Sequence, residues 1–362
     1  MRLIVTGGGT GGHVLPALEV ALLAREAGHD VQYFGSVRGQ ESRACARAAM
    51  PFRGIESRPL RRLYTFQGLS SAIVLLRAVG AARTLLNEIR PDVLFSTGGY
   101  SASPFLTASR MLGITVVIHE QNSVPGRTHK IAAKHAAKKC IVFEEAALRL
   151  GEGCVRTGMP IRKEIVKAAQ QPKPDSKEGF LTFALGGSQG AAALNEVVMS
   201  AALRINGQSN RWLHVSGEKQ YESMAKSADR LGAFPGYRIR PYLQAGEMAD
   251  ALASADLAVA RSGAGVLAEL ALFGIPSILI PYPFAYANHQ YHNAKLFENM
   301  GAAEIIEQRL LTPEKLETAW REWHANEDRR AAASQKLKEW AIADAAERVL
   351  QQIEEAHRAH QG

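Results

Sequence analysis

A glycine-rich turn closed by a histidine lies near the start of the chain. The turn Gly7-Gly8-Gly9-Thr10-Gly11-Gly12-His13 follows an apolar run over residues 2–6. Glycine turns between a strand and a helix let backbone N–H groups converge on an anion, and the helix N-terminus adds partial positive charge. Because an imidazole titrates near neutral pH, His13 could serve as a general base, although a lone histidine is more often structural. The turn therefore predicts anion binding, and it leaves the role of His13 open.

The same turn can be read as the dinucleotide pattern GxGxxG through Gly7, Gly9 and Gly12. A dinucleotide site also needs an acidic residue at the end of the second strand, ~20 residues on, to bind a ribose hydroxyl. That strand is expected to end at Tyr33-Phe34-Gly35-Ser36, which contains no carboxylate. The pattern is therefore weak evidence for a dinucleotide.

A second glycine turn repeats the arrangement of the first. The apolar run 180–185 leads into Gly186-Gly187-Ser188-Gln189-Gly190-Ala191. One such turn could merely allow a tight connection between a strand and a helix. Two turns at equivalent places in two arrays of strands and helices suggest a ligand held between two domains.

Three further polar clusters follow predicted strands. Ligands of open α/β sheets bind at the carboxyl ends of the strands. Glu269 lies about a turn and a half into the helix that the small residues at 262–266 begin, where it could reach the ribose of a nucleotide or be an ordinary exposed glutamate. The stretch 281–290 places His289 and Gln290 after another strand, and could also be a structural loop. His119-Glu120-Gln121-Asn122 ends a strand, and we expect these four side chains to lie outside the core.

These residues must be positioned by parallel sheets, because short β-rich runs alternate with helical patterns along the chain. A helix is predicted from Leu15 to Ala27, and helical composition extends from Leu316 to Ala359 with a break near Ala343-Asp344. The turn-like residues 157–160 and the polar, Pro-rich segment 170–177 predict a domain boundary near 160. The predicted strands are 2–6, 31–35, 92–96, 114–119, 139–143, 180–185, 212–216, 237–241, 256–260, 277–280 and 303–306.

The composition limits the class of protein. At 362 residues the chain is long enough for two domains. Its net charge of +8 suits an anionic ligand or membrane surface, whereas 7% aromatic residues without basic interleaving argue against nucleic acid. The three cysteines show no metal-binding or disulfide spacing, which fits a reducing cytoplasm. We expect a protein that is neither exported nor transmembrane.

An apolar helical segment at 69–83 is too short to span a membrane. It contains Ile73 and Leu76, and Arg61, Arg62, Arg77 and Arg83 surround it. The apolar pattern alone favours a core helix. A basic rim around an apolar helix is typical of a peripheral membrane patch, since each cation near anionic lipid contributes ~1 kcal/mol.

Several motifs together resemble the MurG family of peptidoglycan glycosyltransferases. The resemblance implies a GT-B fold, in which two Rossmann-like domains face each other across a cleft and the final helix returns to the first domain, giving domains at 1–160 and 161–340 and a helix at 341–362. It implies inverting transfer of N-acetylglucosamine from UDP-N-acetylglucosamine to undecaprenyl-linked lipid I at the cytoplasmic face of the cell membrane. The motifs are GGTGGH at 8–13, GGYS at 98–101, HEQN at 119–122, GGSQGA at 186–191, RSGA at 261–264 with Glu269, and HQ at 289–290 before Asn293-Ala294.

The resemblance also assigns roles by position. His13 would be the base, with Glu120 as second candidate, and Thr10, Gly11 and Gly12 would line the reaction centre. Gly8, Gly9, Gly98, Gly99, Tyr100 and Ser101 would receive the acceptor diphosphate. Asn122 would reach the donor sugar. The remaining donor contacts would be Arg162, Ser188, Leu243, Ala264, Gly265, Val266, Leu267, Ala268, Glu269 and Gln290, with the backbone of Leu243 at the uracil and Glu269 at the ribose.

Two positions depart from the family pattern, namely His289, where glutamine is common, and Val266, where threonine can occur. The chain has no Asp-x-Asp pair to bind a metal-nucleotide, so we expect no metal or cofactor, and backbone amides and helix dipoles would stabilise the leaving UDP. Proteins of cell-wall synthesis are candidate partners. Two alternatives remain: a related enzyme with a diacylglycerol acceptor, and a non-catalytic nucleotide-sugar or dinucleotide-binding protein.

Overall fold

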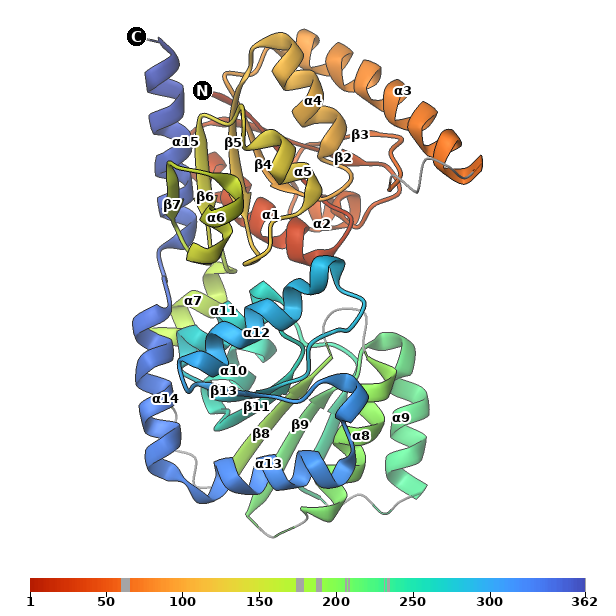
Figure 1. The fold of residues 1–362 in the computed structure, drawn as a ribbon, viewed down its shortest axis with the longest axis vertical. Helices are drawn as coiled ribbons and strands as arrows, with labels where there is room; N and C mark the ends of the chain where they lie inside the picture. The colour runs from red at the N-terminus through yellow and green to blue at the C-terminus, as the bar shows by residue number, and fades with distance from the viewer. Residues whose placement is uncertain are drawn as a thin grey trace. The chain divides into compact units, whose positions relative to one another are not determined.

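The computed structural model describes residues 1–59, 66–173, 179–186, 191–205, 207, 209–230, 232 and 235–361, without the side chains of 66–72. The chain divides into two compact units. Unit 1 contains Met1–Ile161 and Asp344–Gly362, and unit 2 contains Arg162–Ala343 (Figure 1). Each unit is built on one parallel sheet, so the predicted α/β class with two parallel-sheet domains is confirmed.

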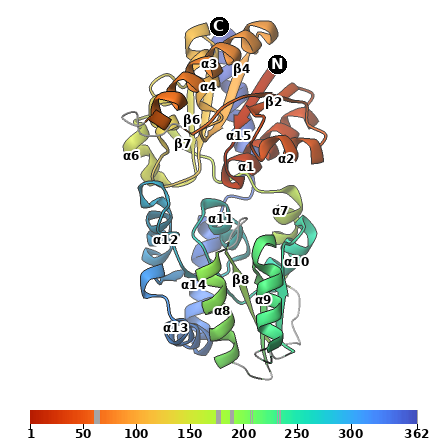
Figure 2. The same ribbon diagram turned by 90° about the vertical axis from the view of Figure 1, so that its right-hand side faces the viewer.

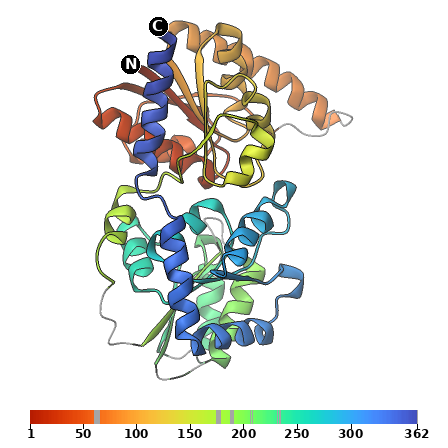
Figure 3. The same cartoon turned by 60° about the vertical axis from the view of Figure 1, so that its left-hand side comes forward.

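Unit 1 has a seven-stranded sheet in the order β3-β2-β1-β4-β5-β6-β7. Its helices include a C-terminal helix, α15, which packs against α1, β5 and β6; Figure 3 shows it running along the sheet. The strands are β1 (Arg2–Gly7), β2 (Asp30–Ser36), β3 (Phe52–Ile55), β4 (Val93–Gly98), β5 (Thr115–Glu120), β6 (Lys138–Ile141) and β7 (Cys154–Arg156). The helices are α1 (Gly11–Glu26), α2 (Glu41–Arg47), α3 (Phe66–Ile89), α4 (Ser103–Leu112), α5 (Arg127–Ala132), η1 (Glu144–Ala146), α6 (Ala147–Leu150) and α15 (Ala345–Gln361).

The two faces of this sheet bury different helices. Alternate strand residues point to opposite faces. Leu3 and Val5 belong to a core with α1 and α15, whereas Ile4 belongs to a core with α3 and α4. In α15, Val349 and Ile353 are fully buried, and each such side chain contributes ~1.5–3 kcal/mol by leaving water. Apolar burial therefore holds the end of the chain on unit 1.

Unit 2 has a six-stranded sheet in the order β10-β9-β8-β11-β12-β13. Helix α13 packs on α8 and helix α14 packs on α11, and Figure 2 shows α8 beside α9. The strands are β8 (Phe180–Leu185), β9 (Asn210–Val215), β10 (Tyr237–Arg240), β11 (Leu257–Ala260), β12 (Ser277–Leu279) and β13 (Ala303–Ile305). The helices are α7 (Lys163–Ala169), α8 (Ala192–Arg204), α9 (Glu218–Arg230), α10 (Ala245–Ser254), α11 (Ala264–Phe273), η2 (Tyr286–Asn288), α12 (His289–Asn299), η3 (Gln308–Leu310), α13 (Pro313–Ala325) and α14 (Glu327–Trp340).

Some element predictions need correction. The sequence reasoning missed β3 and β7, which are the short edge strands of unit 1. Helix α1 begins at Gly11 and not at Leu15, because the glycine turn itself enters the helix. The C-terminal helical stretch has a further break at Asn326, whose side chain caps α14 by accepting a hydrogen bond from the Arg329 N–H at 2.8 Å.

Helix α3 contributes to the core along one face, and its membrane contact stays a prediction. Its residues Ala78, Ala82 and Leu86 are buried in the core with α4. Ile73 and Leu76 are 46% and 73% exposed, and Arg77 and Arg83 are also exposed. Arg61 and Arg62 lie outside the described residues. One face of α3 is therefore core, and another presents apolar and basic side chains to solvent.

Candidate active site

In unit 1, the glycine turn after β1 lies beside the glycines at 98 and 99, which end the neighbouring strand β4. Gly7 of β1 pairs with Gly98 of β4, and the Gly8 N–H donates to the Gly98 carbonyl at 3.2 Å. Gly99 has φ +85°, and a Cβ there would lie 1.9 Å from the Gly8 oxygen. The turns can approach this closely only without side chains. Tyr100 lies against Gly9, and the Ser101 hydroxyl is buried behind Gly8.

Thr10, Gly11 and Gly12 form the start of α1. Thr10 is the exposed N-cap residue, and its side chain makes no capping hydrogen bond. The first turn of α1 contains no acidic residue. Since the first N–H groups of a helix have no partner within the helix, this end of α1 is suited to an anion.

His13 lies in the first turn of α1 with a defined tautomer. Its Nδ1 is 3.0 Å from the Thr97 carbonyl oxygen and 2.9 Å from Oε1 of Gln121. Both partners only accept, so Nδ1 must carry the proton and Nε2 has a lone pair. Burial lowers the pKa of His13, and the nearby Glu120 carboxylate opposes that shift. A neutral imidazole with a lone pair on Nε2 is the form that a general base needs.

The polar residues at the end of β5 are mostly core, which corrects the expectation that they lie outside it. His119, Glu120 and Gln121 are each at most 2% exposed, and only Asn122 is partly exposed. The polar side-chain atoms of these three residues are hydrogen-bonded, some to residues nearby in the chain and some to distant ones, as buried polar groups require. His119, for example, bonds through Nε2 to the Gly158 carbonyl at 2.8 Å.

The Glu120 carboxylate accepts hydrogen bonds on both of its oxygens. Oε1 accepts from the backbone N–H of Asn122 at 3.0 Å, and Oε2 accepts from the Gly126 N–H at 3.1 Å and from Nδ1 of His129 at 2.8 Å. Burial alone would raise the pKa of Glu120, but the hydrogen bond and charge of His129 and the Asn122 N–H outweigh it and lower the pKa to about 2. Such a carboxylate is a weak base, which favours His13 over Glu120 as the proton acceptor.

A carboxylate does stand at the end of β2, contrary to the sequence reasoning. Glu41 of α2 folds back, and its Oε1 accepts from the Ser36 N–H at 2.8 Å. The side chain is fully buried beside Gly8, Gly35 and Gly39. Because it is enclosed by protein on these sides, Glu41 is not presented to a ribose hydroxyl as a dinucleotide site requires. The prediction considered only the strand end at 33–36, and Glu41 lies five residues beyond Ser36.

In unit 2, the start of α11 and Glu269 lie after strand β11. The N-cap residue Gly263 has no side chain, and the first turn contains no acidic residue. Ala264, Leu267 and Ala268 are buried, whereas Gly265 and Val266 are partly exposed. Because Val266 would offer its backbone N–H, its side chain matters little to an anion at this helix end.

Glu269 forms a charge pair with Arg162. Nη2 of Arg162 lies 3.7 Å from Oε1 of Glu269, and both side chains are less than one-fifth exposed. Burial raises the pKa of Glu269 to about 7, and Arg162 only partly offsets this effect. The structure thus brings these two predicted donor residues together and leaves the carboxylate poorly solvated. Such a group gains from hydrogen-bond donors.

Two other predicted donor residues flank this region. Gln290, in the first turn of α12, accepts through Oε1 from the Tyr282 N–H at 3.0 Å, and its own carbonyl accepts from the Ser262 hydroxyl at 2.8 Å. These bonds tie α12 to the loops after β11 and β12. His289 bonds through Nδ1 to the Tyr286 carbonyl at 2.9 Å. Leu243 is buried between β10 and α10, and Ser188 lies outside the described residues.

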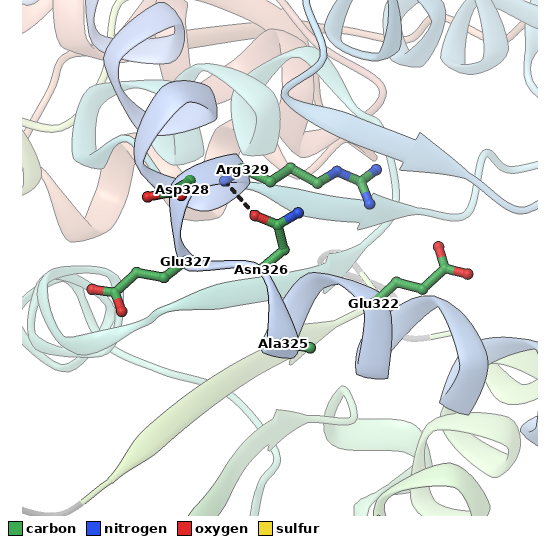
Figure 4. Close-up of a pocket in the computed structure, with 6 residues that line it drawn as sticks. All are labelled: Glu322, Ala325, Asn326, Glu327, Asp328 and Arg329. Atoms are coloured by element: carbon green, nitrogen blue, oxygen red, sulfur yellow. Dashed lines mark hydrogen bonds between the residues drawn. The ribbon is translucent and has the colours of Figure 1, made fainter.

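A surface hollow elsewhere in unit 2 contains none of the predicted site residues. It lies at the turn between α13 and α14, where Asn326 caps the second helix (Figure 4). Among the described residues, no three His, Cys, Asp or Glu side chains lie together as metal ligands. The hollow is lined by Glu322, Ala325, Asn326, Glu327, Asp328 and Arg329.

Comparison with known proteins places the chain in a family. Residues 3–141 match the Glycosyltransferase family 28 N-terminal domain, and residues 181–349 match the Glycosyltransferase family 28 C-terminal domain. The chain belongs to glycosyltransferase family 28. The predicted resemblance and the assignment as a glycosyltransferase are therefore confirmed.

The family 28 chain is similar to relatives over nearly its whole length. It is 34% identical to proteins of Bacillus pumilus and Bacillus subtilis, with 98% of this chain and 99% of each relative covered. Both are named UDP-N-acetylglucosamine–N-acetylmuramyl-(pentapeptide) pyrophosphoryl-undecaprenol N-acetylglucosamine transferase. The crystal structure of Acinetobacter baumannii MurG has a TM-score of 0.80 at 28% identity, with 98% of this chain and 99% of that chain covered.

Within the described ranges, no helix has the length and apolarity needed to cross a bilayer.

Proposed function

We propose that this family 28 glycosyltransferase moves N-acetylglucosamine from UDP-N-acetylglucosamine to the muramyl hydroxyl of undecaprenyl-diphospho-muramyl-pentapeptide, with inversion at the anomeric carbon. The substrates follow from the names of the full-length relatives. The observation in this chain that supports the chemistry best is His13, whose Nδ1 bonds to two acceptors and leaves the lone pair on Nε2.

In this mechanism the acceptor hydroxyl gives its proton to Nε2 of His13 as its oxygen attacks the anomeric carbon. The bond from that carbon to the UDP oxygen breaks on the opposite side, and UDP leaves. The start of α11 would stabilise the negative charge on the leaving diphosphate, since its first N–H groups and dipole favour anions. Glu269 would accept hydrogen bonds from the ribose, and Arg162 would hold Glu269 in place.

The acceptor diphosphate would bind at the glycine turns of unit 1. Gly8, Gly9, Gly98 and Gly99 bring backbone close together, and Tyr100 and Ser101 border them. Asn122, fixed by its bond to Glu120, would contact the donor sugar. Gln290 would contribute to the same sugar site, where His289 replaces a common glutamine.

We further propose that the protein works at the cytoplasmic membrane face through α3. Its exposed Ile73 and Leu76 would enter the interface, and Arg77 and Arg83 would meet anionic headgroups. An undecaprenyl-linked acceptor resides in the membrane, so such contact would bring the glycine turns to their substrate.

Turnover with defined acceptors tests the proposal. Purified protein with UDP-N-acetylglucosamine and a lipid I analogue should release UDP and form a β-linked disaccharide-lipid. A diacylglycerol acceptor should give no product. Product from diacylglycerol alone would establish the alternative acceptor, and UDP binding without product from either acceptor would contradict the assigned acceptor.

A further inference from the structure

A buried chain of hydrogen bonds leads from Gly158 to His13 through the side chains of His119 and Gln121. Nε2 of His119 is 2.8 Å from the Gly158 carbonyl, and Nδ1 of His119 is 3.1 Å from Nε2 of Gln121. Oε1 of Gln121 is 2.9 Å from Nδ1 of His13. His119 and Gln121 are at most 2% exposed, so these bonds form inside the protein.

The direction of each bond in this chain is fixed by the one before it. A carbonyl oxygen only accepts, so Nε2 of His119 donates to Gly158. Burial lowers the pKa of His119 to about 4, which leaves a neutral ring with its second nitrogen, Nδ1, as an acceptor. The Gln121 NH2 group must therefore face His119, and it also donates to the His119 carbonyl at 2.6 Å.

The orientation of the Gln121 amide then determines whether Nδ1 of His13 faces an oxygen or an NH2 group. With its NH2 group toward His119, Gln121 turns its oxygen to Nδ1 of His13. If the amide were turned over, it would present N–H to Nδ1 and would favour the tautomer whose Nε2 is protonated. That tautomer has no lone pair on Nε2 and could not take a proton there. The Thr97 carbonyl, 3.0 Å from Nδ1, requires the same tautomer as the observed orientation.

We propose that His119 and Gln121 are positioning residues that keep the lone pair of His13 on Nε2. This inference rests on the proposed function, in which His13 is the base. His119 and Gln121 act only through His13. The titratable groups near His13 are Glu120, whose charge raises the pKa of His13, and His129, whose charge lowers it. Replacing Gln121 changes the group bonded to Nδ1 and leaves both of these in place.

A spectroscopic experiment observes the tautomer directly. Protein labelled with 15N-histidine, with the His13 signals identified from their loss in His13→Ala, should show His13 protonated on Nδ1 at neutral pH. His13 protonated on Nε2 in the wild type would overturn the inference.

A kinetic experiment tests Gln121 with charged and apolar replacements. Gln121→Met should lower kcat about 10-fold and leave KM for UDP-N-acetylglucosamine within about twofold, because only the base is disturbed. Gln121→Glu places a carboxylate on Nδ1, which raises the pKa of His13 and should move the acid limb of kcat/KM upward by about one pH unit. The control Gln171→Glu adds the same charge at an exposed site of unit 2 and should leave the limb unchanged.

The outcomes separate this inference from the proposed function. If His13→Ala abolishes turnover while Gln121→Met keeps full kcat and Gln121→Glu leaves the acid limb in place, the inference is wrong and the base assignment stands. If His13→Ala retains wild-type turnover, the base assignment is wrong and the inference falls with it.

Discussion

The two units place different chemistry at the carboxyl ends of similar parallel sheets. In unit 1, Nδ1 of His13 is bonded to two acceptors, and Glu120 accepts hydrogen bonds on both oxygens. In unit 2, the charged partner of Glu269 among the described residues is Arg162 at 3.7 Å, and burial raises the pKa of Glu269 to about 7. The Glu120 carboxylate of unit 1 is thus already hydrogen-bonded within the protein, whereas the Glu269 carboxylate of unit 2 still gains from hydrogen-bond donors.

This difference fits a general base in unit 1 and a donor-binding site in unit 2. A general base must be held in one tautomer and orientation before substrate arrives, because preorganisation lowers the barrier. A nucleotide-binding carboxylate can instead take its hydrogen bonds from the ligand. Substitutions in either unit test this contrast, and His13 is the position where we expect the strongest effect.

Removal of the base should have the largest effect. His13→Ala should lower kcat about 10²–10⁴-fold, because the acceptor proton then has no positioned base. Steady-state kinetics with a lipid I analogue measure this change. The control His135→Ala removes an exposed histidine of the same unit and should keep full activity. An equal loss of kcat in both variants would contradict the assignment of His13 as the general base.

The buried carboxylate of unit 1 should matter mainly for stability. Glu120→Gln should destabilise unit 1 by about 1.5–3 kcal/mol, because charge-assisted hydrogen bonds are lost. Hydrogen exchange of unit 1 measures this effect. All four tryptophans, Trp212, Trp320, Trp323 and Trp340, belong to unit 2, so tryptophan fluorescence should show an unchanged unfolding midpoint for that unit.

The stability of unit 1 at acid pH should also depend on Glu120. The pKa of Glu120 is about 2 when folded, below the usual 4.5, so its contribution is present above pH 4.5 and lost as the pH falls toward 2. Glu120→Gln should therefore flatten the loss of stability over that range. An acid profile identical to the wild type would contradict the role given to this carboxylate.

Donor binding should depend on pH through Glu269. A pKa of about 7 means that the carboxylate is protonated below pH 7 and then no longer a full acceptor for ribose hydroxyls. Uridine affinity should fall about tenfold from pH 8 to pH 6, in proportion to the ionised fraction. Uridine is the probe because the terminal phosphate of UDP also titrates near pH 6. In Glu269→Gln the affinity should be weaker and independent of pH.

The smallest effect is expected at the surface of α3. Ile73→Glu should reduce sedimentation with anionic vesicles a few-fold, because an apolar contact is replaced by a charge that the lipid repels. Leu310→Glu is a matched control in unit 2, since Leu310 is 44% exposed and Ile73 is 46% exposed. Equal vesicle binding by the two variants would argue against a membrane role for α3.

The sheets could be predicted because apolar strand runs and glycine turns are local signals. The edge strands β3 and β7 were missed because FRGI and CVR carry little apolar pattern. Burial at the end of β5 could not be predicted from local sequence either. The partners of His119 and His13 are Gly158 and Thr97, which are 39 and 84 residues away in the chain, and only the folded sheet brings them within hydrogen-bond distance.

Titration of UDP into His13→Ala and Glu269→Gln tests whether unit 2 binds the donor nucleotide while His13 of unit 1 acts only in catalysis. Both proteins can be compared with the wild type by calorimetry at pH 8, where Glu269 is mostly ionised. We expect His13→Ala to bind UDP with wild-type affinity and Glu269→Gln to bind it at least about tenfold more weakly, since a charged hydrogen bond is worth about 1.5–3 kcal/mol. Weakened UDP binding in His13→Ala with unchanged binding in Glu269→Gln would contradict this expectation.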